Sequence, residues 1–326
     1  MITMSPRDGF SRRRFVSGGA ASVFLPTALA KAQTIPPNAP LPPDEAAKIA
    51  ADRDAASHLT VDVMIDGKGP FRFVVDTGAD RSVIADDVAA ALGLPIQQQV
   101  MVAGVVLTIP AETVRVGTLS FGPIARNDLT VPILPRALLR ADGYLGLDAI
   151  DGSRVTFDFK NRVLLVASPY HRQSYEVVPP EEARVRVIGE AGHLRSVNCR
   201  ADGVRTTTFI DTGAEISVGN AKLLSALMEI DPTYLRLETV PLTGVTGGTV
   251  QGHITTIKSV HLDSLTFDGC NIVVANLQIF DLWGLRDKPA LLIGMNFLRE
   301  FDRVSIDYGS KELRFDLARL VLAQRA

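Results

Sequence analysis

Residues 73–79 read FVVDTGA, and residues 209–214 read FIDTGA, with Asp76 and Asp211 lying 135 positions apart. In both segments an apolar run typical of a buried strand leads into an aspartate that is followed directly by Thr and Gly. Glycine tolerates backbone conformations that a Cβ would forbid, so a turn of this kind can present a carboxylate at the end of a strand. Two such carboxylates, brought together, would form a catalytic dyad.

The sequence around the two segments repeats as well. An Asp-Gly pair typical of a hairpin turn precedes each segment, and a short helix is predicted after each. The matching stretches are the turns at 66–67 and 202–203, the helices at 85–92 and 221–230, the segments 114–122 and 260–269, the segments YLGLD at 144–148 and LIGMN at 292–296, and the hairpins at 154–166 and 303–315. Five features in one order indicate an internal duplication.

These motifs resemble those of the retropepsin-like aspartic peptidases. That family's motif is an apolar pair, Asp-Thr-Gly-Ala and then a Ser or Thr three residues later, which here reads VVDTGADRS at 74–82 and FIDTGAEIS at 209–217. Its second hallmark is an apolar pair followed by Gly, found at Gly146 and at Gly294. The resemblance extends from about residue 59 to about residue 315.

The resemblance implies a mostly β protein with two retropepsin-like closed β lobes, the acid-protease fold. Most retropepsins are described as homodimers, whereas this chain carries both halves and would form a pseudo-dimer as a monomer, with the active cleft between the lobes. Asp76 and Asp211 would be catalytic. The residues that would support the two active loops are Thr77, Gly78, Thr212, Gly213, Gly146 and Gly294, with the two threonines hydrogen-bonded across the cleft.

An aspartic endopeptidase needs no metal, cofactor or covalent intermediate, because two carboxylates that share one proton can activate a water molecule. The sequence contains no His-Glu-x-x-His, Gly-x-Ser-x-Gly or Cys-His pattern that would favour another hydrolase. The predicted substrate is a peptide or protein. Two alternatives stay open: Asp76 and Asp211 could be turn residues, or the fold could serve as a non-catalytic periplasmic module that holds an extended peptide by strand addition.

The family covers its cleft with a Gly-rich hairpin, the flap. Residues 242–250 read LTGVTGGTV and predict such a hairpin with Gly244, Gly247 and Gly248 at its tip, although a long surface loop is the alternative. The first unit offers only MVAGVV at 101–106, and the second unit is longer in this region. We therefore expect one working flap, from the second lobe.

Two further features have no clear match in the repeat. Tyr144 stands where the family usually has a small aliphatic residue, which leaves the packing of the first active loop open. Trp283 lies beside Phe280 in the stretch 277–289 and would either line a substrate subsite or pack in the core.

The N-terminus predicts export. SRRRFV at 11–16 resembles a twin-arginine motif, an apolar stretch follows, and Ala30-Lys31-Ala32 forms a small-x-small cleavage site. A basic, disordered N-terminus is the alternative. We expect a signal peptide at 1–32, a Pro-rich tether with a helix-prone arm at 33–55, a first lobe at 56–170 and a second at 171–326. This predicts a periplasmic or secreted protein without a stable membrane span after signal removal.

Composition excludes some partners. The net charge is −2, and removal of residues 1–32 leaves a chain near −6 without basic runs, which argues against nucleic acid as a partner. The two cysteines, Cys199 and Cys270, provide neither a disulfide framework nor a zinc site. They would either pair with one another or lie buried as separate thiols.

Overall fold

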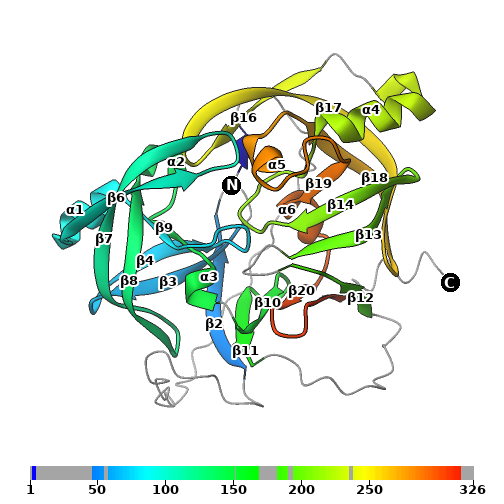
Figure 1. Ribbon diagram of the computed structural model, residues 1–326. Helices are drawn as coiled ribbons and strands as arrows, with labels where there is room; N and C mark the ends of the chain where they lie inside the picture. The colour runs from blue at the N-terminus through cyan, green and yellow to red at the C-terminus, as the bar shows by residue number, and fades with distance from the viewer. Residues whose placement is uncertain are drawn as a thin grey trace, which may run out of the picture.

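The computed structural model describes residues 2–4, 46–54, 58–150, 152–168, 182–189, 194–234 and 238–316. Most of the predicted signal peptide, the Pro-rich tether and the join between the two repeats therefore lie outside the described residues. The described part forms two closed β lobes side by side, joined below by a shared sheet (Figure 1). The predicted fold class is confirmed.

Each lobe is a ring of six strands. In order around the first ring lie β3 (Leu59–Ile65), β4 (Lys68–Val75), β9 (Gly143–Leu145), β5 (Val83–Ala85), β8 (Ile124–Leu134) and β7 (Thr108–Phe121). The second ring repeats it with β13 (Arg195–Ala201), β14 (Val204–Ile210), β19 (Ala290–Ile293), β15 (Val218–Gly219), β18 (Leu265–Val274) and β17 (Gly247–Leu262). The internal duplication is thus a duplication of a closed ring.

Short helices and hairpins follow the same order in both lobes. The helices are α1 (Asp86–Leu92), α2 (Arg136–Leu139) and α3 (Leu147–Ile150) in the first lobe, and α4 (Ala221–Ile230), the 3-10 helix η1 (Pro232–Tyr234), α5 (Gln278–Leu282) and α6 (Met295–Leu298) in the second. Gly93 follows the last residue of α1, and its φ of 64° is the left-handed C-terminal conformation that favours glycine. Each lobe also extends a hairpin strand outside its ring, β6 (Ile96–Ala103) and β16 (Thr239–Gly244), which pairs with β7 and β17 respectively.

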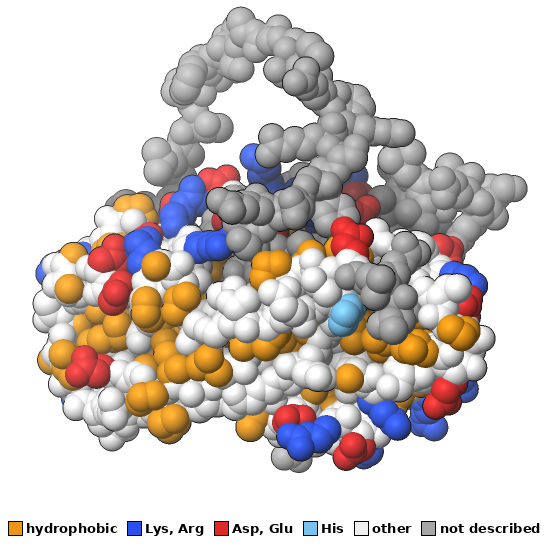
Figure 2. Space-filling view, turned by 90° about the horizontal axis from the view of Figure 1, so that it is seen from above, with side chains coloured by type: hydrophobic (Ala, Val, Ile, Leu, Met, Phe, Trp, Pro, Cys, Tyr) orange, Lys and Arg blue, Asp and Glu red, His pale blue; other side chains and the backbone are white. Residues whose placement is uncertain are grey.

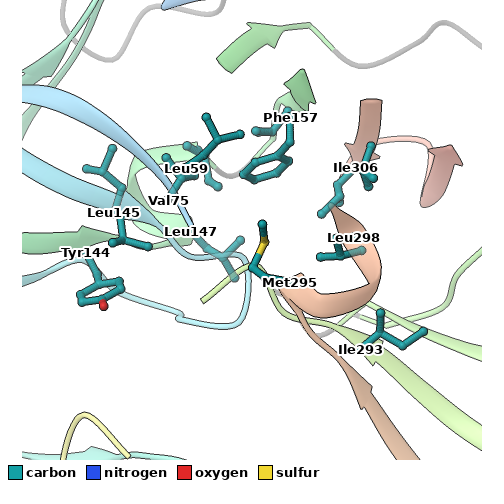
Figure 3. Packing of buried hydrophobic residues seen from close by; sticks show 14 of the residues in the cluster. Leu59, Val75, Tyr144, Leu145, Leu147, Phe157, Ile293, Met295, Leu298 and Ile306 are labelled. Carbon is teal, nitrogen blue, oxygen red and sulfur yellow. The ribbon is translucent and has the colours of Figure 1, made fainter. Parts of the chain in front are cut away.

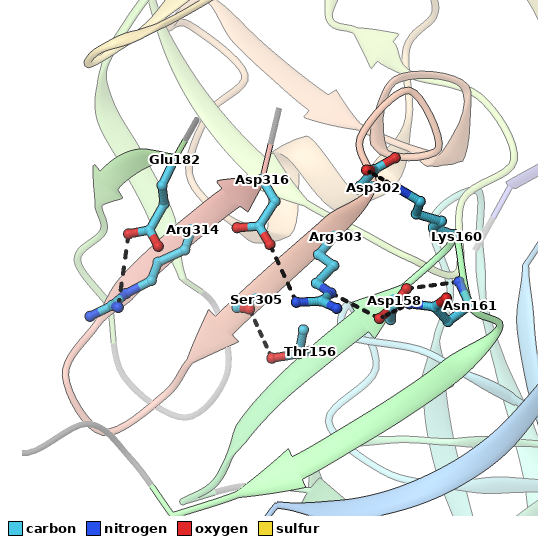
Figure 4. A network of polar contacts seen from close by, with 10 residues as sticks. All are labelled: Thr156, Asp158, Lys160, Asn161, Glu182, Asp302, Arg303, Ser305, Arg314 and Asp316. Carbon is cyan, nitrogen blue, oxygen red and sulfur yellow. Dashed lines mark hydrogen bonds and ion pairs between the residues drawn. The ribbon is translucent and has the colours of Figure 1, made fainter. Parts of the chain in front are cut away.

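A six-strand sheet joins the lobes from below. Its order is β2 (Ala47–Arg53), β11 (Val163–Ala167), β10 (Arg154–Asp158), β20 (Arg303–Asp307), β21 (Glu312–Asp316) and β12 (Glu182–Arg186). The two lobes meet where β10 pairs antiparallel with β20, with Thr156 opposite Ser305. Their hydroxyl groups lie 2.8 Å apart, and the pair Asp158–Arg303 flanks them on one side (Figure 4).

The predicted helix-prone arm is wrong, because residues 47–53 form strand β2. This strand pairs with β11 on one side and with β3 on the other. Ala47 and Ile49 are buried, whereas Lys48 and Ala50 are exposed. Burial of alternate side chains in a sheet overrides a weak helix propensity, which costs at most about 0.7 kcal/mol per ordinary residue.

One continuous apolar core runs beneath both active loops. Val75 and Leu147 from the first lobe and Met295 from the second belong to the same buried cluster. Figure 3 shows Leu147 and Met295 facing one another between the halves, with Phe157 of the shared sheet close by. Since both active loops rest on one core, their relative position is fixed by packing as well as by hydrogen bonds.

Candidate active site

Asp76 and Asp211 lie at corresponding points of the two rings. Strands β4 and β14 each end at one of these aspartates, and each runs parallel to the strand that carries the Leu-Gly or Ile-Gly motif. The N–H of Asp76 donates to the carbonyl of Leu145 at 2.9 Å, and the N–H of Asp211 donates to that of Ile293 at 3.0 Å. The parallel pairing thus brings the two sequence motifs of each repeat together.

The two aspartate loops interlock through their threonines, as expected. The backbone N–H of Thr77 donates to the hydroxyl of Thr212 at 3.1 Å, and the N–H of Thr212 donates to the hydroxyl of Thr77 at the same distance. The hydroxyl of Thr212 also donates to the carbonyl of Val75 at 2.8 Å, and the hydroxyl of Thr77 donates to that of Ile210 at 3.4 Å. This reciprocal network links residues that are 135 positions apart in the chain.

The interlock brings both carboxyl groups to one buried point. Asp76 is 5% exposed and Asp211 is 4% exposed, and each carboxyl group lies against the loop glycine that follows the other aspartate. Each carboxylate also accepts a 2.8 Å hydrogen bond from the glycine of its own loop, Gly78 or Gly213. The structure therefore assembles the predicted pair of carboxylates.

The loop glycines are required by close approach rather than by a left-handed backbone. A Cβ on Gly78 would lie 2.8 Å from Cγ of Asp211, and a Cβ on Gly213 would lie 2.5 Å from Cγ of Asp76. Neither glycine has a positive φ. The sequence-based reason for these glycines was thus incomplete, because the space they leave is filled by the carboxylate of the opposite loop.

A buried serine, Ser82 in the first lobe and Ser217 in the second, supports each active loop through hydrogen bonds. The hydroxyl and N–H of Ser82 both donate to Oδ1 of Asp148, at 2.7 and 2.8 Å, and the N–H of Gly146 donates to the Ser82 hydroxyl at 3.1 Å. In the second lobe Ser217, Asn296 and Gly294 make the same three bonds at 2.7, 2.8 and 3.0 Å.

The sequence motifs include these serines and glycines, but they give no role to Asp148 and Asn296, whose side chains hold the serines. The one available signal is that Asp148 and Asn296 occupy the same place in the two repeats. Burial raises the pKa of Asp148, while the hydrogen bonds from Ser82 lower it in part. The glycines are needed here for space, since a Cβ on Gly146 would lie 2.3 Å from the carbonyl carbon of Arg81.

Burial also dominates the electrostatics of the dyad. Desolvation raises the pKa of Asp76 to about 7, and the neighbouring charge of Asp211 adds to the rise. Two carboxylates in contact cannot both ionise without a large cost, so the pair keeps one proton. This arrangement supplies one acid and one base at the same point.

Two hairpins cover this part of the molecule, so the expectation of a single flap is wrong. The first lobe's hairpin, β6–β7, turns at 104–107, and the second lobe's hairpin, β16–β17, turns at 245–246. The hydroxyl of Thr246 donates to the carbonyl of Leu107 at 2.7 Å, which joins the two tips. The extra length of the second unit lies outside its flap, around α4 and η1 ahead of it and in residues 275–289 after it, which explains why length gave a misleading comparison.

The predicted flap glycines do lie at this tip. Gly247 and Gly248 have φ values of 82° and 75°, in the region that favours glycine, and Gly244 ends β16 directly before the turn. A Cβ on Gly104 of the first hairpin would lie 2.0 Å from the hydroxyl oxygen of Thr246. The glycine of the first hairpin is therefore as closely involved in the tip contact as those of the second.

The stretch 277–289 holds the first hairpin in place. The N–H of Ile279 donates to the carbonyl of Val105 at 3.2 Å, and the side-chain amide of Gln278 donates to the hydroxyl of Thr108 at 2.6 Å. Trp283 stacks on Phe209 with ring centroids 4.1 Å apart and packs against the second lobe's core. Of the two interpretations of Trp283, core packing is confirmed.

Tyr144 fits into the first lobe without disturbing its active loop. Its ring is buried, and its hydroxyl donates to the carbonyl of Leu139 at 2.9 Å. Burial and the nearby carboxyl of Asp76 raise the pKa of Tyr144, so it stays a neutral donor. The larger side chain is thus accommodated by a hydrogen bond to the end of α2.

Other reactive groups in the described residues offer no competing centre. Cys199 and Cys270 are separate, buried thiols, and burial raises their pKa values to about 11 and about 12. No group of three or more His, Cys, Asp or Glu side chains in the described ranges is arranged to hold a metal ion. In the same ranges no helix has the length and hydropathy that a membrane span needs.

The sequence model of a family described as aspartyl protease matches residues 61–149 and 197–297. Together the two matches cover more than half of the chain, and each contains one Asp-Thr-Gly loop with its glycine motif. A search of curated proteins finds no match. With two matches, two closed rings and one interlocked pair of aspartates, the chain belongs to the retropepsin-like aspartyl protease family and carries two copies of the family's repeat.

Proposed function

We propose that this protein is a single-chain aspartic endopeptidase that hydrolyses peptide bonds through water activated by Asp76 and Asp211. The observation that carries the proposal is the contact of two carboxyl groups, each at most 5% exposed, held together by reciprocal hydrogen bonds of Thr77 and Thr212. Burying two acids beside one another is costly, and a purely structural pair of turns would not need it.

The chemical step follows from the shared proton. The ionised carboxylate takes a proton from a water molecule while the water oxygen bonds to the carbonyl carbon of the peptide. The protonated carboxyl gives its proton to the carbonyl oxygen, which yields a tetrahedral diol. When the carbon–nitrogen bond breaks, the nitrogen receives a proton from one carboxyl, and a hydroxyl of the diol gives its proton to the other carboxylate. The products are an amine and a carboxylic acid, and the pair again holds one proton.

Several features of the surroundings favour an extended peptide as the substrate. The flap strand β16 lies at the edge of its sheet apart from a short N-terminal strand, so its main chain can pair with an added strand. Figure 2 views the face with β16 and β17, where the described apolar side chains gather in a band and the charged ones lie mainly toward the rims. A net charge of −2 gives no support to nucleic acid as a partner.

The proposal includes export. An arginine pair, an apolar stretch and a small-x-small sequence in residues 11–32 resemble a twin-arginine signal and support this proposal, and export would place the mature protein in the periplasm or outside the cell. The two lobes already form one complete site, so the active form is proposed to be a monomer.

Mass-spectrometric mapping of a peptide library tests this function. The mature protein recovered after export should cut peptides at internal bonds, pepstatin should inhibit it, and Asp211→Asn should yield no products. Capture of peptides without cleavage by the unchanged protein would instead favour the non-catalytic binding module. Cleavage that persists in Asp211→Asn would contradict the proposed chemistry.

A further inference from the structure

The chain's own N-terminus occupies the edge of the second flap. Strand β1 (Ile2–Met4) pairs antiparallel with β16, with Ile2 opposite Gly244, Thr3 opposite Thr243 and Met4 opposite Leu242. In Figure 1 this strand lies centrally, between the two lobes and beside β16. The three residues it covers directly precede the flap tip.

This pairing breaks the symmetry of an otherwise duplicated molecule. The equivalent edge in the first lobe is β6, which ends its sheet, and no strand in the described part of the chain lies on its outer side. Because a sheet edge exposes unpaired N–H and C=O groups, either flap could accept an added strand. Only the flap of the second lobe has one, and that strand comes from a distant part of the sequence.

Two prolines limit the contact to the three residues nearest the flap tip. Pro241 lies in β16 directly before Leu242, and Pro6 follows β1 after one intervening residue. Proline has no N–H to donate to a strand ladder, so it ends strand addition. The N-terminal segment therefore fits the tip of the flap and not the whole of β16.

We propose that residues 2–4 act as an intramolecular blocker, which keeps the precursor from binding peptides until export removes residues 1–32. The inference rests on the proposed function, since it concerns the same cleft. One edge of a strand can pair with only one neighbour at a time. A peptide that adds to β16 near its tip must displace β1.

Covalent attachment makes even a weak blocker effective. Residues 5–45 connect β1 covalently to the rest of the chain, so the pairing of β1 with β16 is intramolecular. Such a tether gives an effective concentration on the order of 1 mM. A segment with an intrinsic dissociation constant of about 0.1 mM would then lower the apparent affinity for a competing peptide by about tenfold.

The test uses the full chain, produced without export, and replaces single residues of β1 by proline. Alternate residues of a strand point their N–H groups at a given neighbour, so Thr3→Pro or Met4→Pro must remove a donor from the ladder. Thr3→Val and Met4→Leu are matched controls that keep both N–H groups. Hydrogen exchange of the β16 amides and the binding of a fluorescent peptide with the sequence of residues 1–9 are the two readouts.

We expect at least one proline variant to speed exchange in residues 239–244 and to bind the labelled peptide about tenfold more tightly than its control. Equal exchange and equal binding in proline variants and controls would overturn the proposal. Exchange protection that rises with protein concentration would also overturn it, because it would point to the N-terminus of a second copy. Neither readout needs cleavage, so an inactive protein would count against the proposed peptidase and leave this result interpretable.

Discussion

At the scale of single residues, the site depends on burying two acids that water would keep apart. Asp76 and Asp211 lie in contact at the centre of the molecule, and their hydrogen-bond donors include the glycines of their own loops. The cost of this burial appears as a raised pKa of Asp76. Burial of both carboxyl groups therefore causes the pair to share one proton and also lowers the stability of the fold.

This liability can be measured with Asp76→Asn. An unfolded Asp has a pKa near its ordinary value of 3.8, and burial raises the folded value to about 7. Between these values the folded chain binds more protons than the unfolded chain, so stability falls as pH rises through this window. Asparagine does not titrate. In thermal unfolding, Asp76→Asn should therefore unfold at a higher temperature than the natural protein at pH 7.5, with a difference that shrinks toward pH 4. A constant difference across this range would contradict the assignment.

Local motifs explain which site residues could be predicted. Asp76, Thr77 and Gly78 are adjacent in sequence and recur at 211–213, so one short pattern identifies both loops. Asp148 could not be assigned in this way, because its partner Ser82 lies 66 positions away and either residue alone reads as an ordinary polar residue. The contact exists because β5, which begins directly after Ser82, pairs antiparallel with β9 and brings the two segments together.

At the scale of elements, the flaps show how a count of residues can mislead. The second unit is longer between its aspartate and its downstream Gly element, but the additional residues lie around α4 and η1 ahead of the flap and in the stretch 275–289 after it, rather than in a larger flap. Strand β6 has eight residues and β16 has six, so the first lobe's hairpin is no smaller than the second's. Glycine content predicted the position of the second flap correctly and gave no information on the first.

The contact between the flap tips leads to a prediction for Thr246→Val. The change removes the 2.7 Å hydrogen bond to the carbonyl of Leu107 and keeps the shape of the side chain. Loss of about 1 kcal/mol from the closed state should lower kcat/KM roughly fivefold. Thr249→Val is the control, since its hydroxyl bonds to Thr243 within the same hairpin and away from the opposite flap. Steady-state kinetics on one peptide would show the difference, and an equal effect of both changes would contradict a role for the tip contact.

At the scale of the whole molecule, the two repeats act as one unit because they share a sheet and a core. The central strands β10 and β20 pair across the join. The pseudo-dimer could be predicted from the duplicated motifs, whereas the place of β2 could not. Its seven residues carry no repeat signal, and only their pairing with β11 and β3 decides their structure.

The ion pair at this join predicts the effect of Asp158→Asn. The Asp158 carboxylate is nearly buried and accepts bonds from Asn161 and from the guanidinium of Arg303 at 2.8 Å. Burial raises the pKa of Asp158, but these hydrogen bonds together lower it by more, so the net shift is downward. The stabilisation is therefore present above the ordinary Asp pKa and is lost as pH falls through the lowered value.

In denaturant unfolding at pH 7, Asp158→Asn should cost about 1–3 kcal/mol, because the neutral amide of Asn has only one acceptor oxygen and cannot keep both the bonds from Asn161 and the charged bond from Arg303. Asp302→Asn serves as its control. Asp302 pairs with Lys160, whose side chain is 60% exposed. Such a surface pair contributes about 0–1 kcal/mol. A larger loss in the control than in Asp158→Asn would contradict the importance of the join.

The proposed export concerns the whole precursor and can be tested with two conservative changes. Replacement of both Arg12 and Arg13 by Lys keeps the charge and removes the arginine pair that the twin-arginine route requires. The precursor should then stay in the cytoplasm, as seen by fractionation and by the size of the protein. Mature protein in the periplasm despite both changes would exclude this route and favour the general secretory pathway.

The central claim is that Asp76 and Asp211 work as one catalytic unit, and a double-mutant comparison of kcat/KM tests it most directly. One peptide substrate is used with the mature protein, Asp76→Asn, Asp211→Asn and the double variant, with circular dichroism to confirm folding. Residues that share a proton are not additive, so each single change should reduce kcat/KM by at least about 1000-fold, with no further loss in the double variant. Near-normal activity of either single variant, or losses that multiply in the double variant, would contradict the shared dyad.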